Sequence, residues 1–160
     1  IEAMGNDAVV IGSAGNDLVF SSIRLDNNAS AVSGYIQRNA VQSESRTHGF
    51  FYQPESTLSG LLGLPLIGGD SQRPTAAVKY LRNKNLQLSD LGMLTASNNS
   101  NLNDNCQASC VDLYGNARPI FIGKRVYALM GYELVEGRIT GNDIIEQRRL
   151  NYAPQLQRNR

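Results

Sequence analysis

The sequence predicts an all-β protein. Apolar residues occur in short runs rich in Val, Ile, Leu, Phe and Tyr, and Gly, Asn, Asp and Pro separate these runs. This pattern is typical of strands joined by turns. No long stretch places apolar residues at i, i+3, i+4 and i+7 behind an N-cap, as an amphipathic helix requires. The two observations together favour strands throughout.

The apolar runs define the expected strands, which are 8–13, 18–25, 31–37, 48–53, 61–67, 77–83, 86–94, 118–123, 125–139 and 144–153. Several turns between them have a physical basis. Asn16 and Asp17 follow Gly15 and are residues that tolerate a positive φ, and segments 82–85 and 122–125 have hairpin length. Pro65 has no amide hydrogen, so it indicates an edge strand or a bulge within its run.

The expected strands fall into three sets, at about residues 5–40, 46–94 and 110–153, each as long as one four-stranded blade. We therefore predict antiparallel four-stranded blades of a β-propeller, about three of them in a partial ring, over residues 1–154. A β-sandwich is the alternative. Residues 155–160 are predicted to form a frayed basic tail.

A partial ring has a consequence for the partners of the chain. An open arc of blades leaves strand edges and apolar faces in water. The chain begins with Ile1 and not with Met. We therefore expect it to be the C-terminal portion of a larger ring, held by the remainder of the parent chain or by other subunits of an assembly.

Charge and hydrophobicity exclude two other kinds of partner. The 160 residues carry a formal net charge of +1, which does not indicate a nucleic-acid-binding surface. Hydrophobic residues make up 41% of the chain, enough for a globular core, but no apolar run approaches the roughly 20 residues of a membrane span. We predict no nucleic-acid partner and no transmembrane segment.

Three Gly-Asn-Asp triplets, at 5–7, 15–17 and 141–143, raise the question of calcium. In a calcium β-roll such triplets recur every nine residues, which stacks the aspartates of successive turns. Here the first two triplets are ten residues apart and no third repeat follows them. We interpret the triplets as hairpin turns and predict no cofactor. The alternative is a calcium-stabilised adhesin-like domain in which Asp7 and Asp17 bind the metal.

Cys106 and Cys110 are the two cysteines, and three residues separate them in a polar, Asn-rich stretch. A short disulfide is the preferred interpretation, and it indicates an oxidising compartment. Two free thiols or half of a metal site remain as alternatives, although a metal site needs more ligands than these two.

No residue is assigned a catalytic role. His48 is the single histidine, and neither a Gly-x-Ser-x-Gly elbow nor a Gly-x-x-x-x-Gly-Lys phosphate loop is present. Glu133 and Glu136 have the composition of a glycosidase carboxylate pair, but we interpret them as surface residues of a strand. The enzymatic alternative is a hydrolase subunit whose active site is completed by a missing part of the chain.

Two clusters are candidates for binding. Phe50, Phe51 and Tyr52 offer rings for stacking against a ligand, although alternation along a strand places at least one ring on each face. Arg148 and Arg149, with Arg158 and Arg160 near the C-terminus, form a basic cluster that we interpret as a solvated terminus.

Most of the chain resembles a known kind of protein. Segments 45–54, 60–69, 76–94 and 106–139 resemble the C-terminal part of large secreted or envelope-anchored bacterial proteins with β-propeller-like repeats. Segment 3–25 is similar to a strand-turn-strand unit of the same proteins. The chain departs from the better-known propeller repeats because it has no Trp and a single Gly-Gly pair.

The resemblance implies a location and a role, but no catalytic residues. It implies a protein that is secreted, periplasmic or at the cell surface. Together with the absence of a reactive cluster, it predicts a non-catalytic structural or binding module in which loops at the blade ends carry recognition.

Overall fold

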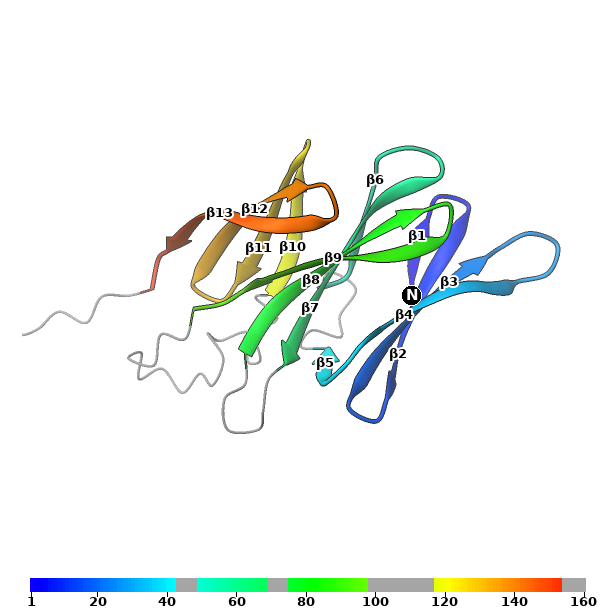
Figure 1. Cartoon of the computed structure of the whole chain (residues 1–160), viewed down its shortest axis with the longest axis horizontal. Coiled ribbons are helices and arrows are strands. Elements are labelled where there is room, and N and C mark those ends of the chain that lie inside the picture. The colour runs from blue at the N-terminus through cyan, green and yellow to red at the C-terminus, as the bar shows by residue number, and fades with distance from the viewer. Residues whose placement is uncertain (43–48, 69–74, 98–116, 154–160) are drawn as a thin grey trace, which may run out of the picture.

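A computed structural model describes residues 1–42, 49–68, 75–97 and 117–153 of the chain (Figure 1). These residues form thirteen strands in three antiparallel sheets, none of which closes into a barrel, and none of them belongs to an α-helix. The prediction of an all-β protein is confirmed. The predicted tail at 155–160 lies outside the described residues.

Sheet A is an antiparallel meander formed by the first four strands. Its strands lie side by side in chain order: β1 (Glu2–Met4), β2 (Asp7–Ala14), β3 (Asp17–Arg24) and β4 (Ser30–Gln37). Leu18, Phe20 and Ser22 alternate with more exposed residues along β3, so one face of this sheet is buried and the other faces outward.

Sheet B has five strands, which are β5 (Ala40–Gln42), β6 (Phe51–Pro54), β7 (Ser59–Gly68), β8 (Thr75–Lys84) and β9 (Gln87–Thr95). Strands β5 and β6 pair with opposite ends of the same side of β7, while β8 pairs with its other side. The prediction of four strands per sheet is therefore wrong here, because the first position is divided between two short strands.

Sheet C repeats the plan of sheet A. Its strands are β10 (Ala117–Ile122), β11 (Arg125–Met130), β12 (Glu133–Thr140) and β13 (Asp143–Asn151), again in chain order. The single strand expected at 125–139 is wrong, because a turn at Gly131 and Tyr132 divides it into β11 and β12. The apolar pattern continues through this turn, so Gly131 is the residue in the sequence that indicates it.

The three sheets stack face to face, with sheet B in the middle. β4 contacts β9 and β1 contacts β6 across the A–B interface, and β10 contacts β7 while β13 contacts β9 across the B–C interface. Early strands therefore lie over early strands and late strands over late ones. The three sheets match the three sets of strands expected from the sequence, and Figure 1 shows them as a blue, a green and a yellow-to-orange group.

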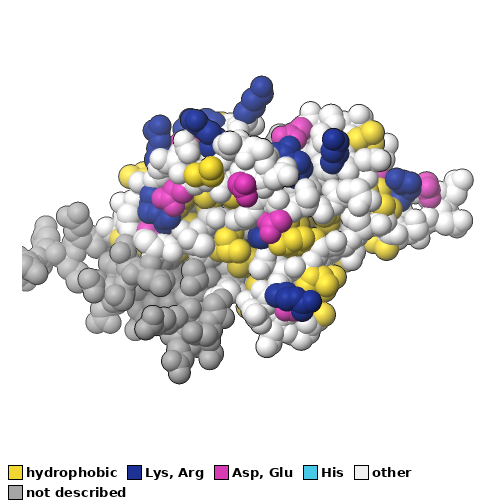
Figure 2. Space-filling model, viewed as in Figure 1, with side chains coloured by type: hydrophobic (Ala, Val, Ile, Leu, Met, Phe, Trp, Pro, Cys, Tyr) yellow, Lys and Arg dark blue, Asp and Glu magenta, His cyan; other side chains and the backbone are white. Residues whose placement is uncertain are grey.

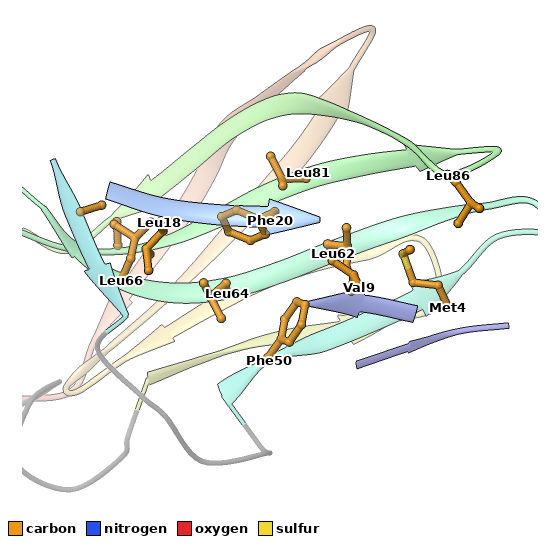
Figure 3. Close-up of a cluster of buried hydrophobic side chains, with 12 residues drawn as sticks. Met4, Val9, Leu18, Phe20, Phe50, Leu62, Leu64, Leu66, Leu81 and Leu86 are labelled. Atoms are coloured by element: carbon orange, nitrogen blue, oxygen red, sulfur yellow. The ribbon is translucent and has the colours of Figure 1, made fainter. Parts of the chain in front are cut away.

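Two hydrophobic cores hold this stack together. The A–B core contains Val9, Leu18 and Phe20 from sheet A and Leu62 and Leu64 from β7 (Figure 3). The B–C core is formed by a further set of buried residues: Leu61, Ala76, Val78, Tyr80, Leu91, Leu94, Ala117, Val126, Ala128, Met130 and Val135. Adjacent residues of β7 enter opposite cores, which explains why segment 60–67 is apolar without alternation.

Pro65 lies in a strand that is paired on both sides. β6 pairs with β7 as far as Gly63 and β5 pairs from Leu66 onward, so positions 64 and 65 have no partner on that side among the described residues. The expectation of an edge strand or a bulge is wrong. A gap between two short neighbours accommodates a residue that has no amide hydrogen.

The hairpin turns confirm the interpretation of the Gly-Asn-Asp triplets. Gly5, Gly15 and Gly141 each have a φ between 61° and 68° and begin a two-residue turn. A positive φ at the first central residue is the type II′ geometry that suits the right-handed twist of hairpins. In the second triplet Gly15 itself adopts the positive φ, not the Asn16 or Asp17 expected from the sequence.

The turn between β8 and β9 is of another kind. Both of its central residues, Asn85 (φ 51°) and Leu86 (φ 64°), have a positive φ, as a type I′ turn requires. A leucine is rare in this conformation. Its side chain is buried in the A–B core, and its carbonyl accepts hydrogen bonds from Ser22 and Ser33 of sheet A, both at 2.6 Å.

Candidate functional site

The aromatic candidates are divided between the core and the surface. Phe50 is buried in the A–B core, and Tyr52 packs against the same core while its hydroxyl accepts a hydrogen bond from Asn83 Nδ2 at 3.1 Å. Phe51 points to the opposite face of β6 and is 39% exposed. The three rings therefore do not form one stacking platform.

Asp7 and Asp17 lie at opposite ends of β2 and β3, which pair along their full length. Seven residues of extended strand separate these ends by about 23 Å. Asp7 Oδ1 accepts a hydrogen bond from the Leu25 amide at 3.0 Å, and Asp17 Oδ1 accepts one from the Asn39 amide at 2.9 Å. The structure does not bring the two carboxylates together, and each stabilises a neighbouring turn.

No cluster of three or more His, Cys, Asp or Glu side chains is placed to hold a metal in the described part of the chain. His48, Cys106 and Cys110 lie outside the described residues. None of the described residues belongs to a helix with the length and hydrophobicity of a membrane span.

Glu133 and Glu136 point to opposite faces of β12, because they are three positions apart and side chains alternate between the faces of a strand. Glu133 is buried between sheets B and C, where its carboxylate accepts hydrogen bonds from Arg149 Nη1 at 2.7 Å and from the Ser97 amide at 2.8 Å. Ser97 Oγ and Asn151 Nδ2 donate to the same carboxylate. The interpretation of Glu133 as a surface residue is therefore wrong, because its 2% exposed side chain has the contacts of a structural anchor.

A second polar cluster links sheets A and B. Lys79 is 3% exposed, and its Nζ lies 2.8 Å from Asp90 Oδ1 and 5.2 Å from the centre of the Tyr35 ring. The Tyr35 hydroxyl donates to Asp90 Oδ2 at 2.8 Å. Burial acts to raise the pKa of Asp90, but hydrogen bonds from Lys79, the Gly92 amide and Tyr35 outweigh it and lower that pKa. Burial and the adjacent carboxylate raise the pKa of Tyr35.

The centre of the outer face of sheet A has no charged side chain. At the edge of this face, Asp17 begins β3 and its Oδ2 lies 3.3 Å from Arg38 Nη1. Register and burial place on it, with their side chains outward, Val10, Gly12, Val19, Ser21, Ile23, Gly34 and Ile36. Ile36 is 50% exposed. An apolar sheet face is ordinarily covered, as the inner face of the same sheet is by sheet B.

The outer face of sheet C differs in charge. It carries four arginines and one glutamate, in register across all four strands: Arg118, Arg125, Arg138, Arg148 and Glu136. Figure 2 shows Lys and Arg side chains gathered over this part of the molecule. The two ends of the stack are therefore unlike, one uncharged at its centre and the other basic.

A cleft of about 900 Å³ is lined by residues of both sheets B and C. On sheet C the lining takes residues of the inner face, such as Val126, and charged residues of the outer face, such as Arg125 and Arg138. Sheet B lines it with residues 53–55, Leu61 and Arg82, and sheet C with the β10–β11 turn, residues 136–139 and residues 147–148. Its lining includes five basic and two acidic side chains. This is the size of a small-molecule site.

Of the residues that line the cleft, sequence patterns single out Arg148 and Glu136 but not the others. Arg82, Arg125 and Arg138 are far apart in the sequence and converge because β8, β11 and β12 pack across one interface. The available signal was the concentration of arginine after residue 117. Arg149 points away from the cleft to Glu133 and Glu146, so the basic pair of Arg148 and Arg149 is divided between two sites.

Comparisons with protein-family models, with curated proteins and with solved structures found no match for this chain.

Proposed function

We propose that the chain is a non-catalytic structural module of a larger β-propeller-like assembly, in which a further sheet covers the outer face of sheet A. The observation that carries this proposal is the uncharged centre of the outer face of sheet A, where Val19 and Ile36 pair across β3 and β4. The same kind of packing already occurs within the chain, because each of its two interfaces is one antiparallel sheet packed against the face of another.

In the isolated chain, a second copy of the chain covers this face. The outer face of sheet A of one copy then packs against the same face of the other copy. Docking sheet C of another copy on sheet A would remove water from four arginines against the uncharged centre of this face, which is costly. Two faces with uncharged centres meet without this cost. A two-fold arrangement also makes the same face complementary to itself.

The assembly is proposed to belong to a secreted or envelope-associated bacterial protein. This part of the proposal is supported by the resemblance of segments 45–54, 60–69, 76–94 and 106–139 and by the closely spaced Cys106 and Cys110. Alkylation followed by mass measurement tests the oxidising compartment: two thiols should react only after reduction if the purified native protein carries the disulfide.

Light scattering after size exclusion tests the assembly. We expect a concentration-dependent mass above the 17.5 kDa of one chain, tending to twice that value. Ile36→Lys places a charge on sheet A and should shift the population to monomer. The matched control is Ile122→Lys, since Ile122 is 60% exposed on sheet C. A chain that stays monomeric at every concentration and unfolds sharply contradicts the proposal, as does a dimer broken by the control.

A further inference from the structure

The cleft between sheets B and C has an apolar floor. Leu61 from β7, Phe121 from β10, Val126 from β11 and Ile139 from β12 line it, and Phe121 packs edge-on against Tyr80 with ring centroids 6.2 Å apart. Tyr80 in turn donates a hydrogen bond to the Tyr127 carbonyl at 2.6 Å. The floor therefore packs against the B–C core.

The rim of the cleft carries more positive than negative charge. Glu136 accepts a hydrogen bond from Arg125 Nε at 2.8 Å and lies 3.1 Å from Arg148 Nε, so one carboxylate is shared by two arginines. The hydrogen bond from Arg125 lowers the pKa of Glu136 below its ordinary value. Arg82 lies 3.7 Å from Glu55, the other acid of the lining.

Two cations remain on the rim without an ion pair. Lys124, in the β10–β11 turn, and Arg138, on β12, make no salt bridge with any residue in the described ranges. The charge of Arg138 contributes to the lowered pKa of Glu136, but the closer partners of that carboxylate are Arg125 and Arg148. Both line the cleft, and the two acids of its lining are already engaged by other arginines. Excess positive charge above an apolar floor is complementary to an anion that carries a hydrophobic body.

We propose that this cleft binds small organic anions in which a carboxylate or phosphate is attached to an apolar ring. Arg138 and Lys124 bind the anionic group, and Phe121 with its aliphatic neighbours contacts the ring. Arg138 supplies a planar guanidinium that matches either oxyanion in two-point contact, while Lys124 acts as a point charge. This inference goes beyond the proposed assembly, because sheet A does not contribute to the cleft.

The probe for the test is 2-naphthyl phosphate, with neutral 2-naphthol and inorganic phosphate as comparisons. Amide shifts of Gly123 and Gly137, both in the cleft lining, report binding at this location by NMR titration. We expect saturable binding of 2-naphthyl phosphate that weakens with added salt. Either comparison compound should bind about tenfold more weakly, since each lacks one of the two contacts.

Variants locate the anionic contact. The double variant Lys124→Gln/Arg138→Gln should weaken binding of 2-naphthyl phosphate about tenfold or more, since it removes charge-assisted contacts. Both residues are free of ion pairs in the described structure, so the variant is expected to fold. The control is Arg118→Gln, an exposed arginine of sheet C outside the cleft, which should change affinity less than about twofold.

Several results overturn the proposal. If the amide shifts of Gly123 and Gly137 do not saturate in the titration, the cleft does not bind the probe. An equal loss in Arg118→Gln shows general electrostatic attraction. If 2-naphthol binds as tightly as 2-naphthyl phosphate, the cleft is an apolar patch that does not recognise an anion. If inorganic phosphate binds as tightly as 2-naphthyl phosphate, the apolar floor does not contribute to binding.

Discussion

Ser22 Oγ lies 2.6 Å from the carbonyl oxygen of Leu86, and this hydrogen bond connects the centre of sheet A to a strained turn of sheet B. Ser22 is fully buried and Leu86 has a φ of 64°, which costs energy for a residue with a β-carbon. Ser33 donates to the same carbonyl at 2.6 Å. The turn is thus held in its conformation from the neighbouring sheet.

The two serines should act together on stability. Ser22→Ala or Ser33→Ala alone leaves one donor for the Leu86 carbonyl, and each should lower the free energy of unfolding by about 1 kcal/mol. The double variant leaves this carbonyl without a donor. We expect its loss to exceed the sum of the single losses by about 1 kcal/mol in urea denaturation. Ser21→Ala, on the outer face of β3, is the control, and strict additivity would contradict the shared-acceptor interpretation.

The ion pair of Lys79 and Asp90 should make stability dependent on pH. Asp90→Asn leaves the buried Lys79 without its carboxylate and should cost about 1–2 kcal/mol at neutral pH, less than a fully buried pair because the Asp90 side chain is 49% exposed. Asp90 has a lowered pKa when folded, so its contribution is present above the ordinary value of 3.8 and disappears as the pH falls through the folded pKa.

Urea denaturation of both proteins at neutral pH and below pH 3.8 measures this effect. The stability difference between wild type and Asp90→Asn should shrink in acid. Tyr35→Phe removes one hydrogen bond to Asp90 but no charge, and its effect should be smaller. A difference that persists unchanged in acid would exclude the ionised pair as its cause.

Gly137 should be intolerant of a β-carbon. A β-carbon at this position would lie 2.8 Å from Ile144 and 3.0 Å from Leu94, inside the B–C core. Gly137→Ala is therefore expected to lower the free energy of unfolding by about 1–3 kcal/mol through overpacking. Gly12→Ala is the matched control, because a β-carbon there meets no atom within 4 Å. Equal thermal stability of the two variants would show that the core adjusts freely.

Glu133 and Glu146 both pair with Arg149 but should differ in their importance. Glu133 is buried and accepts four donors, so Glu133→Gln should cost about 2–4 kcal/mol by disturbing a desolvated network. Glu146 is exposed on the surface, and Glu146→Gln should cost less than about 1 kcal/mol. Urea denaturation measures both losses. A larger loss of unfolding free energy in Glu146→Gln than in Glu133→Gln would contradict the anchoring role of Glu133.

Local features of the chain determined the class of fold and the division into three sheets. Gly5, Gly15 and Gly141 mark hairpin turns by their own conformational freedom, and the apolar runs between such turns have the length of strands. These effects act within a few residues, so the sequence expresses them directly. Whether the stack continues into a propeller depends on what covers sheet A, and that surface lies beyond the chain's own contacts.

Only the tertiary structure decided which sheet lies in the middle and which charges converge. Leu61 and Leu62 are adjacent and equally apolar, yet they enter different cores because β7 has a sheet on each face. Arg82, Arg125 and Arg138 form one cleft because strands distant in sequence pack across the B–C interface. Packing between sheets is a long-range effect that depends on all the strands at once. The continuous apolar run of β7 is typical of a strand covered on both faces, but it does not say which sheets cover it or which arginines converge.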